Sequence, residues 1–301
     1  MQHQDINSRI ESIYGLVMPE SFFAFWEFAN RVTFPVLRDA LDIIGLLGPF
    51  DLLQADLVRE HDPIWHARYY NDPPEFLTLM AGLTDGYHWG YYIDDPEQPQ
   101  FSVASYYSND AFDLHIAGSD LIEATRKELE LHYRDCQDNL TSDPKYASEY
   151  EARLERLDGI RVLLQQYGTA DRLERGWDYY EKYHIRGTSQ RNVVAATRDG
   201  MGIVVPQNSY RPLARDDPFQ IWNYHPSADE AQQMSDNALE SLRAGFPGTA
   251  LKLGKDLWIY SEHQILSYRL LDDSYDALHR PLLRRYLDIA RRYREWCDAK
   301  P

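Results

Sequence analysis

The chain has 301 residues, of which 44% are hydrophobic and 13% aromatic, so it can bury a large core and is globular rather than disordered. A formal net charge of −17 argues against direct binding to the phosphates of DNA or RNA. The chain has two cysteines, too few for a disulfide framework, and no basic leader or long apolar run is visible. We therefore expect no signal peptide and no membrane span. The expected location is the cytoplasm, or the nucleus if the source is a eukaryote.

The N-terminal part carries the signals of consecutive helices. Gly15 ends a first short helix and Pro19 begins a second, in which aromatic residues recur at helical spacing. Apolar residues between positions 36 and 44 predict a third helix. We expect the aromatic stripe to lie in the core, because such stripes pack against other elements far more often than they bind ligands.

A rigid turn is predicted at residues 68–76. Pro73 and Pro74 fix two successive φ angles and remove two backbone donors, so the segment cannot lie inside a helix or a strand. The apolar run at residues 76–80 predicts a buried strand, and aiming that strand is the simpler interpretation of the turn. A second interpretation depends on the motif as a whole: Arg68, Tyr69, Tyr70, Asn71, Asp72, Pro73, Pro74, Glu75 and Phe76.

An antiparallel sheet is predicted after this turn, followed by a helix from Ser119 to about Cys136. The polar segment 138–145 then ends a first domain, residues 1–140, and leaves residues 141–301 as a second domain. The strands of the first domain are predicted at residues 76–81, 87–94 and 101–107.

The second half begins with a charged helix that ends near Gly168 and connects the two domains. Ser227 and Glu230 form a capping box that opens a later helix, and Arg198-Asp199-Gly200 has the chemistry of a hairpin turn. We therefore expect the α+β class, with two packed mixed units in which antiparallel sheets are flanked by helices. The other predicted elements of this half are strands at 192–197, 201–205, 249–253 and 256–260, and an amphipathic tail helix at 281–297.

No residue pattern indicates an enzyme in its own right. The sequence contains no glycine-rich phosphate loop, no G-x-S-x-G and no C-x-x-C, and its ten histidines lack the spacing of metal ligands. We therefore expect no metal site, and a stand-alone enzyme is the weakest functional hypothesis.

Several blocks of sequence resemble the histone PARylation factor family, the accessory proteins of poly(ADP-ribose) polymerases. The turn, with the sequence RYYNDPPEF, is similar to a hallmark of that family. The resemblance extends over nearly the whole chain, and we identify the protein as a divergent or bacterial member. The other matching blocks keep the family's order and lie at residues 13–22, 47–53, 86–91, 200–206, 210–211 and 251–258.

The resemblance implies a role on a protein partner. Family members bind the catalytic domain of an ADP-ribosyltransferase next to its NAD site and complete a shared active site there. By this likeness the chain alone binds no cofactor, and NAD is held by the partner. A family glutamate, preceded by an aspartate, takes the proton of the acceptor serine, which is a poor nucleophile without a base. The family arginine that holds the partner's surface is matched by Arg211, beside Tyr210.

The sequence departs from the family at the position of the base. Counted back from Gly254 without a gap, the family's Asp-Glu pair falls on Arg243 and Ala244, neither of which can accept a proton. A gap would bring Glu240 into the position, although a solvated helix carboxylate is the usual state of such a residue.

The expected site therefore combines partner-binding residues with one candidate base. Tyr210, Arg211 and Arg243 are the expected partner-binding residues, and Glu240 is the candidate catalytic residue. A salt bridge between Arg211 and a nearby carboxylate such as Asp216 is the structural alternative.

A different class of function stays open. The helix–glycine–proline–helix opening is similar to the SUKH superfamily, which includes many bacterial immunity proteins. Two hypotheses result: an accessory protein that binds an ADP-ribosyltransferase and modifies its output, and a SUKH-like immunity protein that binds and neutralises a toxin. A neighbouring polymerase gene would favour the first and a secreted toxin gene the second.

Overall fold

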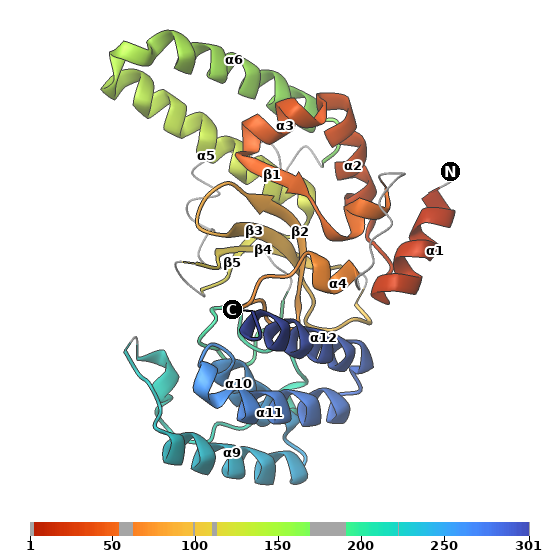
Figure 1. Ribbon diagram of the computed structural model, residues 1–301, viewed down its shortest axis with the longest axis vertical. Coiled ribbons are helices and arrows are strands. Elements are labelled where there is room, and N and C mark those ends of the chain that lie inside the picture. Colours follow the sequence, from red (N-terminus) through yellow and green to blue (C-terminus); the bar gives the residue numbers. More distant parts are fainter. Residues whose placement is uncertain are drawn as a thin grey trace.

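A five-stranded antiparallel sheet lies at the centre of the computed structural model, which describes residues 3–53, 63–98, 100–109, 113–168, 191–221 and 223–300. Each strand pairs with its neighbour in the chain, so the sheet is a simple meander (Figure 1). The three strands predicted after the turn are confirmed. The strands are β1 (Ile43–Leu46), β2 (Phe76–Gly82), β3 (Tyr87–Tyr92), β4 (Ser102–Tyr107) and β5 (His115–Gly118).

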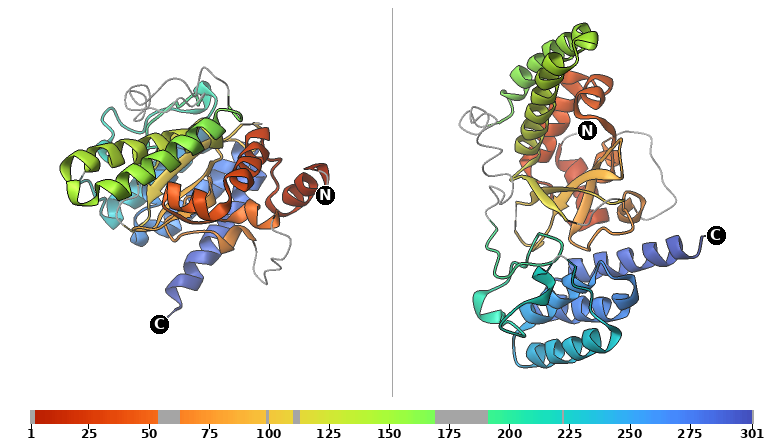
Figure 2. Two further views of the ribbon diagram at one scale, coloured as in Figure 1. Left: turned by 90° about the horizontal axis from the view of Figure 1, so that it is seen from above. Right: turned by 90° about the vertical axis from the view of Figure 1, so that its left-hand side faces the viewer.

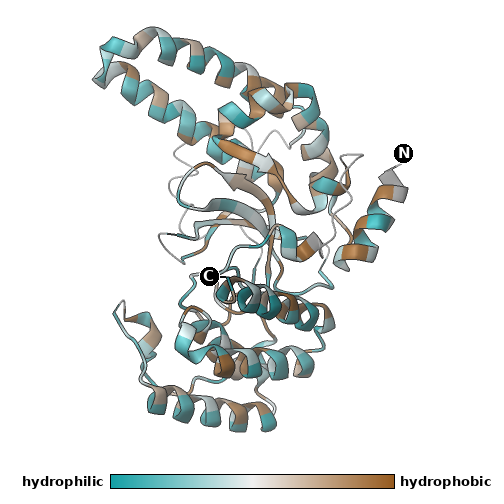
Figure 3. Ribbon diagram, in the orientation of Figure 1, coloured by the Kyte–Doolittle hydropathy of each residue, from teal (hydrophilic) through white to brown (hydrophobic). Residues whose placement is uncertain are grey.

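Helices α2, α3, α5 and α6 of the first half lie on one side of this sheet (Figure 1). α5 and α6 run side by side and project beyond the sheet edge, joined by the short helix η2 (Pro144–Tyr146) (Figures 1 and 2). Hydrophilic residues dominate their projecting ends, and apolar residues gather where the helices meet the sheet (Figure 3). The helices of this half are α1 (His3–Tyr14), α2 (Glu20–Val32), α3 (Phe34–Leu41), η1 (Gly48–Leu52), α4 (Pro63–His66), α5 (Leu121–Ser142) and α6 (Ala147–Leu164).

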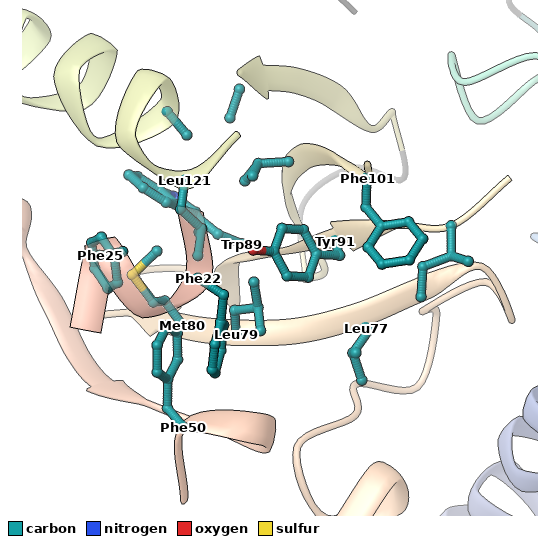
Figure 4. Close-up of a cluster of buried hydrophobic side chains, with 14 of the residues drawn as sticks. Phe22, Phe25, Phe50, Leu77, Leu79, Met80, Trp89, Tyr91, Phe101 and Leu121 are labelled. Atoms are coloured by element: carbon teal, nitrogen blue, oxygen red, sulfur yellow. The ribbon is translucent and has the colours of Figure 1, made fainter. Parts of the chain in front are cut away.

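The core of this half forms between α2, α5 and the sheet (Figure 4). Phe22 of α2 stacks on Phe50 of η1, with ring centroids 4.3 Å apart. Leu77 and Leu79 of β2 point into the same core at the period of a strand, and a register irregularity between Thr78 and Met80 brings Met80 into it as well. The predicted aromatic stripe is therefore core.

Helices from the second half lie on the opposite side of the sheet, with α9 outermost (Figure 1). The sheet residues on this side form a separate buried cluster that includes Phe76, Tyr92 and Tyr106. The capping box of Ser227 and Glu230 is confirmed at the start of α9. The elements of this half are η3 (Gln207–Ser209), η4 (Pro218–Gln220), α9 (Ala228–Arg243), α10 (Pro247–Leu257), η5 (Ser261–His263), α11 (Gln264–Ala277) and α12 (Pro281–Asp298).

The second sheet expected for this half is wrong within residues 191–221 and 223–300. Residues 249–253 belong to α10, which begins with a proline in its first turn, and residues 256–260 cover its end. The helix buries almost every side chain, so its apolar residues occur in short runs that match a strand equally well. Gly254 lies inside α10, where a Cβ would meet Leu271 of α11 at 2.9 Å. The close packing of the two helices therefore explains the glycine.

Two further expectations need correction. The hairpin around Gly200 turns as predicted, with a positive φ of 79°, but only one isolated bridge, Ala195 with Ile203, joins its arms. The third helix ends at Leu41, and Ile44 belongs to β1 instead. Asp42 has a left-handed conformation that ends the helix.

The division at residue 140 stays a prediction. α5 continues to Ser142, and one hydrophobic cluster contains Phe22 together with Leu157, Leu251 and Leu283, which all lie beyond residue 140. The α+β class is confirmed. No helix in the described part of the chain is long and apolar enough to cross a membrane.

Candidate partner-binding site

Asp72 organises the turn at residues 68–76. Its carboxylate is fully buried and accepts hydrogen bonds from the Tyr69 backbone N–H at 2.9 Å, the Thr78 hydroxyl at 3.2 Å and the Tyr106 hydroxyl at 2.5 Å. Burial opposes ionisation, but the charge and hydrogen bond of His88, together with the nearby charge of Arg68, hold the pKa of Asp72 below its ordinary value. The carboxylate is therefore ionised.

The ring of His88 lies between two acceptors. Its Nε2 is 2.8 Å from Oδ1 of Asp72, and its Nδ1 is 2.7 Å from the carbonyl oxygen of Gly86. Both partners are acceptors, so either one suits an N–H of the ring. Tyr69 stacks on this ring with centroids 4.1 Å apart.

Arg68 closes the turn from inside. Its guanidinium donates to the carbonyl oxygens of Asp72 at 3.2 Å, Pro73 at 2.9 Å and Phe76 at 3.2 Å. The two prolines offer no backbone N–H, so the guanidinium of Arg68 supplies the donors that the nearby carbonyl groups need.

The turn also holds the two halves of the molecule together. Trp258 donates its indole N–H to the carbonyl of Asn71 at 3.0 Å, and Tyr275 donates its hydroxyl to Glu75 at 2.6 Å. The buried guanidinium of Arg294 donates to the Tyr70 carbonyl at 2.9 Å and lies 3.8 Å from the Trp258 ring centroid. These contacts support the structural interpretation of the motif.

Replacing Pro74 by alanine is expected to lower the free energy of unfolding by between about 1 and 2 kcal/mol. Pro74 is buried, so the change removes packed ring carbons and also frees the unfolded backbone. Urea unfolding measures the effect, and Pro206→Ala is the matched control because Pro206 is exposed. A loss for Pro74→Ala no larger than that for Pro206→Ala would show that the turn is not a packed structural element.

Arg211 lies at the surface, two residues after η3. Its guanidinium rests over the ring of Phe246, 4.6 Å from the centroid, and donates to the Ser241 hydroxyl at 3.2 Å. Its backbone is fixed by Thr249, whose hydroxyl accepts from the Arg211 N–H at 3.1 Å and donates to its carbonyl at 2.7 Å. Among the described residues Arg211 forms no ion pair, so the alternative of a salt bridge to Asp216 is wrong.

The other expected site residues gather around the end of α9. Glu240 and Arg243 are exposed, and neither side chain is paired with any described residue. Ala244 caps the helix, with its N–H donating to the Glu240 carbonyl at 3.0 Å. Tyr210 is half-buried, and burial raises its pKa. In the sequence of α9, Glu240 directly precedes Ser241, the residue that contacts Arg211.

Sequence reasoning missed Ser241 and Phe246, which hold the Arg211 guanidinium. Both lie at least 30 positions from Arg211, so local patterns carry no sign of the contact. Phe246 stands directly before the proline that begins α10, and an aromatic residue at a helix junction was the one available signal.

A pocket of about 190 Å³ adjoins this surface, between the segment that follows Tyr210 and helices α9 and α10. Lys252 bridges two carboxylates there, with Nζ 2.7 Å from Asp217 and 2.5 Å from Asp256. Burial raises the pKa of Asp256 to about 7, against the opposing effects of Lys252 and the Arg198 backbone N–H. Nowhere in the described residues does a group of histidine, cysteine, aspartate and glutamate side chains have the arrangement of a metal site.

Fold and site together define an α+β protein with an exposed, arginine-bearing surface at the end of α9. The family model described as Histone PARylation factor 1 matches residues 5–293, and the chain therefore belongs to this family. The family resemblance seen in the sequence is confirmed, whereas the SUKH-like character of the N-terminal half stays a prediction.

Similar proteins cover nearly the whole chain. Histone PARylation factor 1 of Mus musculus is 25% identical over 316 residues, which span 94% of this chain and 85% of the relative. The protein of the same name from Danio rerio is 26% identical, with 95% of this chain and 84% of the relative covered. A putative histone PARylation factor 1-like protein of Homo sapiens is 22% identical, with 98% and 88% covered.

Proposed function

We propose that this protein docks on the catalytic domain of an ADP-ribosyltransferase and modifies its ADP-ribosylation output. The family match over residues 5–293 carries the proposal, because relatives in the family are named as factors in the PARylation of histones. NAD would be held by the partner. We also propose a nuclear location, because the relatives named above come from eukaryotes.

The surface around Arg211 suits the docking step. A guanidinium offers a planar fork of donors that matches a carboxylate, either of a side chain or of a chain end. Phe246 and Ser241 hold the fork in place, so little side-chain entropy is lost when a partner binds. Tyr210 directly precedes Arg211, and the exposed Arg243 lies in the same last turn of α9 as Ser241.

Calorimetry tests the docking directly. The pure protein is titrated with the catalytic domain of a poly(ADP-ribose) polymerase from the source organism, and a one-to-one complex is expected. Heat release no different from buffer would contradict the proposal. A pull-down from a native lysate, read by mass spectrometry, identifies the partner independently.

We further propose that the chain docks without supplying a general base. Arg243 and Ala244 occupy the end of α9, and neither can accept a proton. Glu240 is the candidate base if the complex uses one, because it is exposed and directly precedes the residue that contacts Arg211.

Replacing Glu240 by alanine is expected to leave both partner affinity and the rate of transfer to a serine peptide within about twofold of the starting values. A lost general base would instead slow transfer by roughly 10²- to 10⁴-fold. The measurement is ADP-ribosylation of a serine peptide by the complex with NAD. Glu155→Ala on α6 is the matched control, because Glu155 is exposed on the other side of the sheet. A tenfold or larger loss for Glu240→Ala alone would identify Glu240 as the base.

The immunity-protein alternative is not favoured. The family model matches residues 5–293, which include the N-terminal half on which that alternative depends. Co-purification with a secreted toxin in the pull-down would reverse this preference.

A further inference from the structure

The pocket beside Arg211 has the size of one side chain. Its volume of about 190 Å³ is below the range of roughly 300–1,000 Å³ that is usual for small-molecule sites. Phe219 and Leu253 are buried in its walls, and Met234 of α9 adds a half-buried side chain. Such walls favour an apolar stem over a fully hydrated ligand.

The charges in the pocket are unbalanced toward the negative. Asp216, Asp217, Lys252 and Asp256 all line it. The single ammonium of Lys252 is already shared between Asp217 and Asp256. Asp216 is exposed and forms no ion pair with any described residue. Even with Asp256 protonated, the two other carboxylates outnumber the one ammonium among the lining side chains, which favours a cation.

An arginine side chain fits these walls better than a lysine. Its guanidinium is more weakly hydrated than an ammonium, so it enters an apolar-walled pocket with a smaller loss of hydration. Its several donors can also reach the free carboxylate of Asp216 and the exposed part of Asp217, whose side chain is 31% exposed.

We propose that this pocket binds an arginine side chain of the protein partner that contacts Arg211. Tyr210 lines the pocket and directly precedes Arg211, so one partner surface can reach both places. The identity of the partner rests on the proposed function, whereas the preference of the pocket for arginine does not.

The test uses the full chain and a small probe, N-acetyl-arginine amide, titrated by NMR. We expect saturable shifts at the pocket residues with a dissociation constant of about 1 mM, as for a ligand of this size. The uncharged citrulline analogue should bind at least tenfold more weakly, and the lysine analogue at least threefold more weakly. Asp216→Asn should weaken arginine binding about fivefold without unfolding the chain, because Asp216 is exposed. Glu155→Gln on α6 is the matched charge control.

Three results would overturn the inference: no saturable shift by about 10 mM probe, citrulline binding as tightly as arginine, or unchanged binding to Asp216→Asn. The probe needs no transferase, so its failure leaves docking through Arg211 intact. Conversely, if the probe binds normally but the transferase domain does not bind, the proposed partner is wrong and the proposed arginine pocket stands.

Discussion

Replacing Asp72 by alanine is expected to lower the free energy of unfolding by about 4 kcal/mol. The change leaves the His88 ring and the Tyr106 hydroxyl buried without their carboxylate acceptor. The Tyr69 backbone N–H loses its acceptor as well. Uncompensated buried donors account for the size of the effect, because they lose water on folding and gain no partner in return.

The ionisation of Asp72 also predicts how the free energy of unfolding depends on pH. The folded-state pKa of Asp72 lies below the ordinary value of 3.8, so its ionised form is stabilised by folding. This contribution is complete above the ordinary pKa and is lost as the pH falls through the folded pKa. The difference in unfolding free energy between the native chain and Asp72→Asn should therefore shrink as the pH falls below about 4.

Urea unfolding at several pH values measures both effects. Asp135→Ala is the control, because Asp135 is exposed in the middle of α5, and a change within about 0.5 kcal/mol is expected there. A loss for Asp72→Ala as small as that of the control would show that the buried network does not stabilise the turn.

Replacing Arg211 by alanine is expected to weaken binding of the transferase domain by about 2 kcal/mol or more, roughly thirtyfold in the dissociation constant. Arginine and tyrosine are the residues most often found as interface hot spots, and here Tyr210 precedes the arginine. Because Arg211 is exposed, its loss should change the melting temperature little.

Two further variants separate shape from charge. Arg211→Lys keeps the charge but loses the planar fork, so we expect it to bind more weakly than the native chain and more tightly than Arg211→Ala. Arg156→Ala on α6 removes an exposed arginine elsewhere and should bind normally. Full-strength binding by Arg211→Ala, with normal melting, would move the search to other surfaces of the molecule.

Local patterns in the sequence are sufficient to place several elements. The capping box of Ser227 with Glu230 marks the start of α9, and the apolar period of the tail predicts α12. The strands after the turn follow from apolar runs separated by turn residues. In each case the signal lies within a few residues of the structure that it specifies.

The sequence-based predictions fail where contacts between residues distant in the sequence determine the structure. α10 has short apolar runs and a glycine, which suit a strand equally well, and only its packing against α11 distinguishes a helix. The same limit applies to the site. Arg211 was expected at the partner surface, but Ser241 and Phe246 come from a helix and a junction that the sequence does not link to it.

The turn at residues 68–76 contacts residues far away in the sequence, and this has a consequence for biosynthesis. Asn71 meets Trp258 across 187 positions, Glu75 meets Tyr275 across 200, and Tyr70 meets Arg294 across 224. Contacts of such sequence separation form slowly, because the loop must close before the contact stabilises it. A nascent chain therefore holds an aromatic turn and one sheet face without their cover until the last helix leaves the ribosome. During that interval the exposed surface is a target for chaperones and a starting point for aggregation.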